Sequence, residues 1–284
     1  MNVKELTAPL QLAYIGRHFE QLVKEAVHTR MPHGEFMMDA LSKELEQRKG
    51  NRVQRRIKEA RFPCRKHLVD LDLDEYGDDV RGEIEELAHL DFITDKENVV
   101  LIANSGRGKT HLAIGLGIAA CLADKRVLFT NVPNLVIELK EAMSRNAVTA
   151  FKNKFLKYEI VIIDELGYVS FDTEGCDILF NLISNRLDAG TMIITTNLEF
   201  KEWGTVFKDP HLTGALVDRV ARRAHVLDMS GKSYRFKETK DWLARKGRLN
   251  DGAADTGQHT PVLQPSEVLG FPVGLRPPSN PKTS

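Results

Sequence analysis

Apolar residues near the start of the chain recur every three or four positions, a spacing typical of amphipathic helices. One apolar face runs from Leu12 to Ala26 and a second from Phe36 to Leu45, and Met31–Gly34 interrupts the pattern between them. These faces predict a helical N-terminal domain over residues 1–62. A linker with one amphipathic helix, Gly82–Phe92, should follow over residues 63–95.

From Asn98 onward, short apolar runs rich in β-branched residues alternate with segments of helical spacing. The expected strands are Val99–Ala103, Val127–Thr130, Ile160–Ile163, Met192–Thr196 and Ala224–Asp228. The expected helices are Lys109–Ala123, Pro133–Ser144, Thr173–Ala189 and Leu212–Ala221. Such alternation predicts an α/β domain over residues 96–247, with a parallel sheet covered by helices on both faces. The expected order of the five strands across this sheet is 5-1-4-3-2.

Composition restricts these expectations only in part. The 284 residues contain 40 basic and 40 acidic side chains, so net charge indicates no partner, but the charges are segregated. Residues 48–66 hold nine Lys and Arg against one acid, whereas residues 70–86 hold nine Asp and Glu against one base.

No apolar run approaches the roughly 20 residues of a membrane span. Three widely spaced cysteines, Cys64, Cys121 and Cys176, suggest buried free thiols in a reducing cytoplasm. Residues 248–284, rich in Pro, Gly and Ser, are expected to be a disordered tail.

A glycine-rich turn follows the first expected strand and ends in Gly108-Lys109-Thr110 at the start of a helix. This strand–loop–helix order predicts a phosphate-binding loop, in which backbone amides and the helix N-terminus surround a polyphosphate. Lys109 would reach the β- and γ-phosphates, and the Thr110 hydroxyl would help to hold Mg²⁺. The expected nucleotide-binding residues are Ser105, Gly106, Arg107, Gly108, Lys109, Thr110 and His111.

Two positions of this loop depart from the common pattern. Ala103 stands where the first glycine is usual, which requires a backbone angle φ below zero there. Arg107 stands where a small or hydroxylated residue is common, so it would either add a phosphate contact or crowd the site.

A second candidate site follows the buried run Ile160–Ile163, where Asp164 and Glu165 lie at the carboxyl end of a strand. Open α/β sheets bind ligands at this end. Asp164 would hold Mg²⁺, and Glu165 would polarise the water that attacks the γ-phosphate.

Further candidates lie after the later strands. Asn197 ends the fourth strand and would contact the γ-phosphate or the attacking water. Arg219, with Arg222 and Arg223 as alternatives, would enter a neighbouring subunit's ATP site. Arg235 is another candidate for a phosphate contact.

Basic residues also interleave with Val53 and Ile57 on the expected N-terminal helix, which places cations along one side. A solvated basic helix and a surface for the DNA phosphate backbone are both consistent with this pattern. The candidate DNA-binding residues are Arg48, Lys49, Arg52, Arg55, Arg56, Lys58 and Arg61.

With these motifs the chain resembles the IstB-like AAA+ ATPases, helpers encoded beside bacterial insertion-sequence transposases, and the related DnaC-type helicase loaders. The resemblance spans about residues 5–245 and rests on Gly106–Ala113, Ile163–Tyr168, Ile194–Leu198, Glu202-Trp203-Gly204, Leu216–Arg219 and Ser233-Tyr234-Arg235. Among these, Asp164–Tyr168 and Glu202-Trp203-Gly204 point most narrowly to this family, as does the helical N-terminal domain. It implies ATP and Mg²⁺ as cofactors, assembly of a homo-oligomer on double-stranded DNA, and recruitment or stimulation of a transposase. Two alternatives stay open: a loader that acts on a replicative helicase, and a DNA-binding scaffold that binds ATP without hydrolysis.

Overall fold

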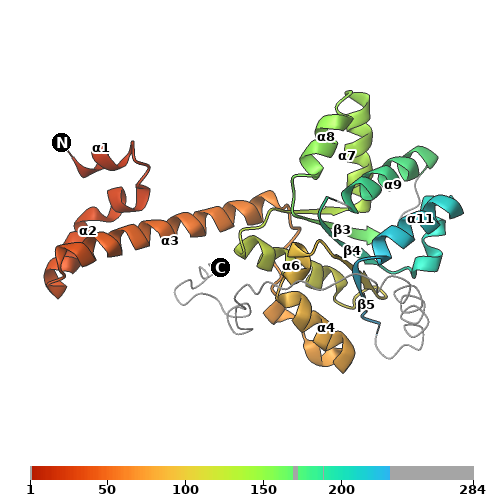
Figure 1. Ribbon diagram of the computed structural model, residues 1–284, viewed down its shortest axis with the longest axis horizontal. Coiled ribbons are helices and arrows are strands. Elements are labelled where there is room, and N and C mark those ends of the chain that lie inside the picture. The colour runs from red at the N-terminus through yellow and green to blue at the C-terminus, as the bar shows by residue number, and fades with distance from the viewer. Residues whose placement is uncertain (1, 169–171, 188, 231–284) are drawn as a thin grey trace, which may run out of the picture. The chain divides into compact units, whose positions relative to one another are not determined.

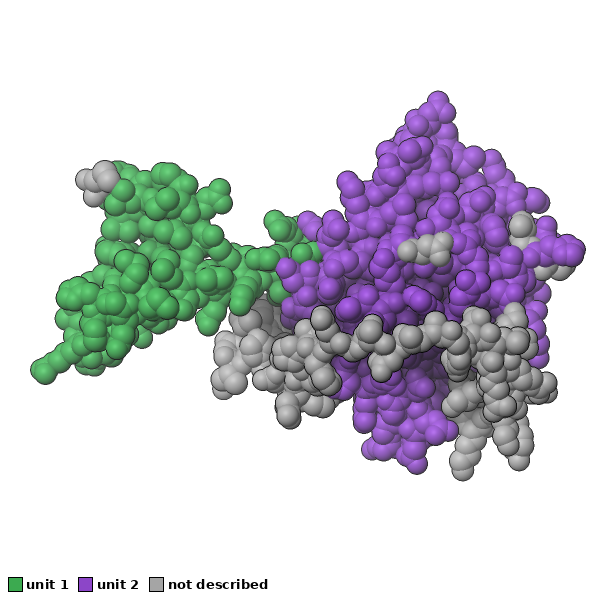
Figure 2. Space-filling model, viewed as in Figure 1, with its two compact units in different colours: residues 1–58 green, residues 59–284 purple. Residues whose placement is uncertain are grey.

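The computed structural model describes residues 2–168, 172–187 and 189–230. The expected tail and the candidate Arg235 lie outside these residues. The chain divides into two compact units, residues 1–58 and 59–284, shown in different colours in Figure 2. Among the described helices, none combines the length and apolar character needed to cross a membrane.

The first unit is helical, as its spacing predicted. Its helices are α1 (Val3–Thr7), α2 (Ala13–Thr29) and α3 (His33–Glu59, whose last residue falls in the second unit). The buried carboxylate of Glu44 on α3 accepts hydrogen bonds from the backbone amides of Tyr14 (2.8 Å) and Ile15 (3.1 Å) in the first turn of α2. Since α2 has no side-chain cap of its own, Glu44 satisfies amides that the helix leaves open.

The expected apolar face of α3 is only partly buried. Ala40 is buried within the described chain, but Met37 and Leu45 are each 56% exposed. The periodicity therefore located the helix correctly without showing how much of the face is covered.

The second unit is built on a five-stranded parallel sheet in the order β2-β3-β4-β1-β5, which confirms the predicted order. Its strands are β1 (Asn98–Ile102), β2 (Val127–Asn131), β3 (Ile160–Leu166), β4 (Thr191–Thr196) and β5 (Ala224–Asp228). The other elements are η1 (Leu68–Asp70), η2 (Leu73–Glu75), α4 (Asp78–Ala88), α5 (Asp91–Thr94), α6 (Lys109–Leu122), α7 (Val132–Ser144), α8 (Val148–Phe155), α9 (Thr173–Leu187), η3 (Phe200–Glu202), α10 (Gly204–Phe207) and α11 (Pro210–Ala221). Nearly every residue of the three central strands β3, β4 and β1 is buried because helices cover the sheet on both sides (Figure 1).

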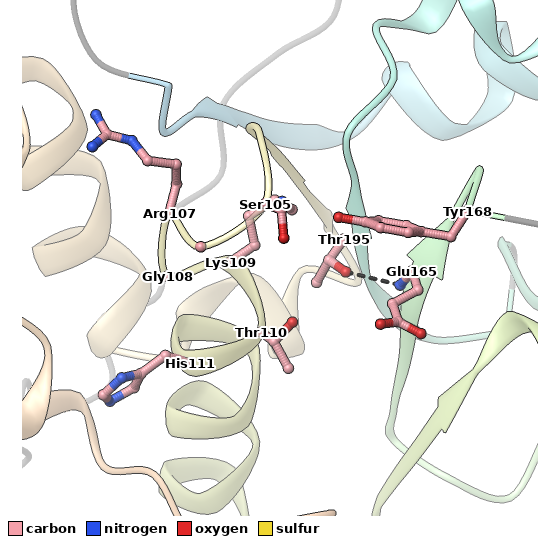
Figure 3. Close-up of a pocket in the computed structure, with 10 residues that line it drawn as sticks. Ser105, Arg107, Gly108, Lys109, Thr110, His111, Glu165, Tyr168 and Thr195 are labelled. Carbon is pink, nitrogen blue, oxygen red and sulfur yellow. Dashed lines mark hydrogen bonds between the residues drawn. The ribbon is translucent and has the colours of Figure 1, made fainter.

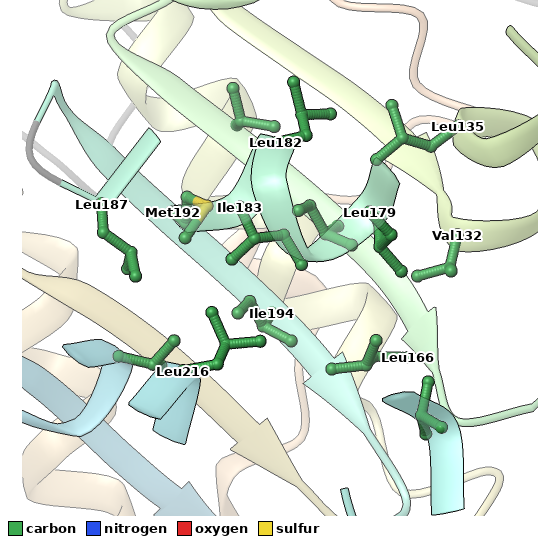
Figure 4. Close-up of a cluster of buried hydrophobic side chains, with 14 of the residues drawn as sticks. Val132, Leu135, Leu166, Leu179, Leu182, Ile183, Leu187, Met192, Ile194 and Leu216 are labelled. Carbon is green, nitrogen blue, oxygen red and sulfur yellow. The ribbon is translucent and has the colours of Figure 1, made fainter. Parts of the chain in front are cut away.

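One face of the sheet carries a cluster of buried apolar residues. Figure 4 shows Leu135 of α7, Leu179 and Ile183 of α9, and Leu216 of α11 packed over Ile194 of β4. This packing fixes β3 and β4 side by side and so positions the carboxyl ends from which the site is built.

Helix α6 packs on the sheet from the other side and also contacts the segment before α4. An added Cβ at Gly115 would lie 2.7 Å from the Leu68 side chain, and one at Gly117 would lie 2.8 Å from Phe62. These glycines allow residues 62–68 to pack closely against the helix that follows the phosphate loop. The sequence placed residue 62 at the end of the N-terminal domain and residues 63–68 in the linker.

Two local expectations were wrong. The expected helix Gly82–Phe92 is instead α4 followed by α5, because Leu90 adopts a left-handed conformation (φ 65°) that breaks the helix. Helix α8 was not expected, because eight residues give too little periodicity. No disulfide joins the three cysteines. Cys121 and Cys176 are buried on helices as expected, whereas Cys64 is exposed, because it lies in the segment before α4 and not on a packed helix.

Candidate functional site

The phosphate-binding loop continues directly from β1. The Ala103 amide donates to the Thr196 carbonyl (3.2 Å), so Ala103 extends the β1–β4 pairing, and its φ is not positive. Gly106 (φ 82°) and Gly108 (φ 80°) make the left-handed turns. The alanine is therefore compatible with the loop, because the turns that require glycine lie at the two later positions.

Lys109 is buried at the start of α6. Its ammonium group donates to the carbonyls of Ala103 (2.7 Å) and Asn104 (2.9 Å), which hold the side chain back over the loop. Burial lowers the pKa of Lys109, and the nearby Asp164 carboxylate partly offsets this shift. An anion in the loop would favour the charged form of this lysine.

The Asp164 carboxylate connects the start of α6 to strand β4 through hydrogen bonds. Its Oδ1 accepts a hydrogen bond from the Thr110 hydroxyl (2.9 Å) and another from the Thr195 hydroxyl (2.5 Å). A carboxylate beside a hydroxyl is a hard-oxygen donor set of the kind that suits Mg²⁺. The described residues contain no cluster of three or more His, Cys, Asp and Glu able to hold a metal ion, so a cation here would also need phosphate and water oxygens.

Glu165 lies in a β-bulge. Between Ile163 and Leu166 the register of β3 against β4 shifts by one residue, and Glu165 takes a positive φ of 65°. In a regular strand neighbouring side chains point to opposite faces, but the bulge brings Glu165 into the pocket next to Asp164. The Glu165 amide donates to the Thr195 hydroxyl (3.0 Å), which fixes the bulge to β4.

These groups converge on a pocket of about 190 Å³ (Figure 3). Its lining contains the seven predicted loop residues, 105–111, together with Glu165, Tyr168 and Thr195. The side chains of Arg107 and His111 nevertheless point away from the space between Thr110 and Glu165. The His111 ring instead lies 2.9 Å from the His67 carbonyl oxygen.

Thr195 and Tyr168 were missed in the sequence. Thr195 is in the fourth expected strand, but the sequence pattern predicts the phosphate contact for Asn197, after the strand end. In the structure Asn197 is exposed and Thr195 lines the pocket. A γ-phosphate contact by Asn197 stays a prediction.

The arginines near the end of α11 stay separate from this pocket's lining. Arg219 lies in the last turn of the helix, and Arg222 and Arg223 follow it; all three are exposed in the isolated chain. A role between subunits remains a prediction for each.

The candidate DNA-binding side chains of α3 are mostly exposed. The side chains of Lys49, Arg52, Arg55 and Lys58 are exposed, whereas that of Arg56 is half-buried. With 3.6 residues per turn, positions 48, 49, 52, 55 and 56 lie within about 120° around the helix axis.

Arg48 and Arg61 are among the members of this basic set that have structural partners. Arg48 donates to the Glu44 carboxylate (3.0 Å) and to the Gln11 carbonyl. Arg61, in the second unit, pairs with Glu138 of α7 (2.9 Å).

The profile of the IstB-like ATP binding protein family matches residues 5–241. A protein of insertion sequence IS232 from Bacillus thuringiensis subsp. berliner, named for ATP binding, is 33% identical over 229 residues, covering 81% of this chain and 92% of that protein. The corresponding IS21 protein of Pseudomonas aeruginosa is 33% identical over 239 residues, covering 84% of this chain and 90% of its own. AMPPCP-bound DnaA from Aquifex aeolicus aligns with a TM-score of 0.50 and 16% identity, covering 65% of this chain and 56% of DnaA, in agreement with the predicted P-loop AAA+ fold. On this evidence, the chain belongs to the family of IstB-like ATP binding proteins.

Proposed function

We propose that this protein hydrolyses ATP, assembles on duplex DNA and assists the transposase of an insertion sequence. The observation that carries the proposal is the convergence of Lys109, Thr110 and Glu165 on one pocket, with the Asp164 carboxylate hydrogen-bonded to the Thr110 hydroxyl. A protein that only held a nucleotide would have no need of a second carboxylate in a strained bulge beside the first. The names of the relatives support the association with insertion sequences.

Each pocket residue has a distinct part in the proposed reaction. Lys109 and the loop amides bind the phosphates, and Glu165 accepts a hydrogen bond from the attacking water and polarises it. Thr110 and Asp164 would hold Mg²⁺, which when bound neutralises phosphate charge. The Thr195 hydroxyl positions both acidic residues, because it donates a hydrogen bond to the Asp164 carboxylate and accepts one from the Glu165 amide.

The proposal extends to subunit contacts. Asn197 contacts the γ-phosphate or the water, and Arg219 contributes its guanidinium to the ATP site of a neighbouring subunit. Both roles suit a homo-oligomer that forms with ATP on DNA.

For DNA we propose the basic side of α3. Its cations would neutralise backbone phosphates and give binding that is salt-sensitive and mostly independent of sequence. The described segment from Arg48 to Arg61 contains no aromatic residue on which single-stranded bases could stack, which favours duplex DNA.

The test measures ATP hydrolysis alone, with duplex DNA and with single-stranded DNA, and sizes the same samples by light scattering. Duplex-stimulated hydrolysis with ATP-dependent oligomers is expected, and Lys109→Ala should abolish both. Glu165→Gln should bind ATP and keep the assembly from dissociating. Stimulation by single strands alone would favour a helicase loader. Undetectable hydrolysis, with Glu165→Gln behaving as wild type, would indicate a scaffold.

DNA binding has its own test. Replacing Lys49, Arg52 and Arg55 together by alanine should reduce the slope of log K against log salt by about three. The charge-matched control replaces Lys4, Arg17 and Lys24, on α1 and α2, and should leave the slope unchanged. Equal slopes for the two triple variants would refute the assignment to α3.

A further inference from the structure

Arg107 lies at the least constrained point of the phosphate-binding loop, between two glycines with positive φ. Glycine has more conformational freedom than any other residue, so a loop flanked in this way needs outside contacts to keep one shape. The structure provides two such contacts, and both involve Arg107.

The first contact is made by the side chain. The Arg107 guanidinium donates to the backbone carbonyl of Ser230, just after β5, at 3.2 Å. That acceptor is itself fixed, since the Ser230 amide donates to the Asp228 carboxylate (2.9 Å) and the Met229 amide to the Ile102 carbonyl (2.8 Å). The guanidinium therefore ties the loop to the edge of the sheet.

The second contact is made to the Arg107 backbone. The Tyr76 hydroxyl donates to the Arg107 carbonyl at 3.1 Å, and Tyr76 is only 7% exposed. Burial raises the pKa of Tyr76, so the phenol remains a donor at neutral pH. A Cβ at Gly108 would lie 2.3 Å from the Tyr76 hydroxyl oxygen, which shows how closely the ring supports the loop.

We propose that Arg107 is a positioning residue, which together with Tyr76 holds the loop amides in place for the phosphates of a nucleotide. It is not itself a phosphate ligand, because its guanidinium points away from Lys109 and Thr110 (Figure 3). The inference rests on the proposed nucleotide binding. Preorganising a loop in this way improves affinity by reducing the ordering cost of binding.

The proposal predicts how binding responds to nucleotide length. ADP and ATP both place phosphates among the loop amides, so loss of the positioning contact should weaken both alike. A direct contact to the γ-phosphate would instead affect ATP alone. Loss of one hydrogen bond that orders the loop corresponds to about a fivefold weaker affinity.

The experiment measures binding of fluorescent ATP and ADP analogues to the full chain carrying Arg107→Ala, Tyr76→Phe or both, and hydrogen exchange of residues 103–108 without nucleotide. Arg145→Ala, which removes a side chain that is 75% exposed, and Tyr14→Phe serve as matched controls. Each test variant should weaken both nucleotides by about fivefold and speed exchange in the loop. The double variant should lose less than the product of the two effects, because both contacts order the same residue.

Weaker binding of ATP alone, with unchanged exchange in the loop, would overturn the proposal and make Arg107 a phosphate ligand. Unchanged affinities in a wild-type background that binds nucleotide would also overturn it while leaving the proposed function intact. If the wild type bound neither nucleotide, the proposed function would fail first, and the inference with it.

Discussion

Glu165 is the proposed general base, and its backbone has a positive φ that few residues other than glycine adopt. Mutations can separate the role of the carboxylate from the cost of this backbone conformation. Its φ of 65° costs an L-residue about 1–2 kcal/mol, whereas glycine has no such cost. Glu165→Ala and Glu165→Gly both remove the carboxylate, but only alanine keeps the Cβ. Greater freedom of glycine in the unfolded chain offsets about 0.5–1 kcal/mol of the relief. The glycine variant should therefore be more stable than the alanine variant by about 1 kcal/mol.

The assay is thermal unfolding of the two variants without nucleotide. For a unit of this size, about 1 kcal/mol corresponds to a difference in Tm of roughly 2–4 °C. Asn181, exposed in the middle of α9, is the matched control position because its backbone is helical. There the order should reverse, with glycine about 1 kcal/mol less stable than alanine.

Both Glu165 variants should also lose hydrolysis by about 10²–10⁴-fold, the usual contribution of a general base. A glycine variant that is more stable and inactive would show that the strain is retained for function. Equal or lower stability of Glu165→Gly relative to Glu165→Ala would refute the strain argument. Retained hydrolysis in either variant would refute the role of the carboxylate.

Three further predictions concern side chains that hold others in place. Thr195→Val removes the hydroxyl that contacts both Asp164 and the Glu165 amide, and steady-state kinetics should show kcat reduced about 10- to 100-fold with a smaller change in KM, while Thr195→Ser should recover most activity. Arg186 is fully buried and donates to three backbone carbonyls, so Arg186→Met should cost about 2–3 kcal/mol in denaturant unfolding; a loss below 0.5 kcal/mol would contradict this. For Glu44, burial acts to raise the pKa, but hydrogen bonds from two amides and Arg48 lower it below its ordinary 4.5. Its stabilising contribution should therefore be present above pH 4.5 and lost as pH falls through the lower folded-state pKa, so Glu44→Gln should flatten the acid-induced loss of α2 measured by hydrogen exchange.

The sheet could be predicted because each strand is a compact apolar run followed by a polar end. Ile160–Ile163 has four buried residues in succession, which only a strand covered on both faces accommodates well. The proximity of Lys109, Thr110, Asp164 and Glu165 could be predicted for the same reason, since the carboxyl ends of parallel strands meet at one edge of the sheet.

The bulge at Glu165 could not be predicted, because it depends on a register shift between β3 and β4 that neither segment encodes alone. That shift also explains why Thr195 was missed, since its hydroxyl has a role only relative to the displaced strand. The direction of the Arg107 side chain could not be predicted either, because the carbonyl that accepts its hydrogen bond belongs to Ser230, 123 residues away in sequence.

The residues expected to contact nucleotide lie in short sequence motifs, while those that hold them are scattered through the chain. Tyr76, Thr195 and Ser230 are common residue types at unremarkable positions. Tyr76 and Ser230 each form one hydrogen bond with Arg107, and Thr195 forms one with the Asp164 carboxylate and one with the Glu165 amide. An intact motif is therefore insufficient for activity, because loop glycines and a strained bulge have many alternative conformations without these contacts. It follows that the departures at Ala103 and Arg107 should be judged by backbone geometry. The first has no positive φ to strain it, and the second has a backbone acceptor that draws it out of the pocket.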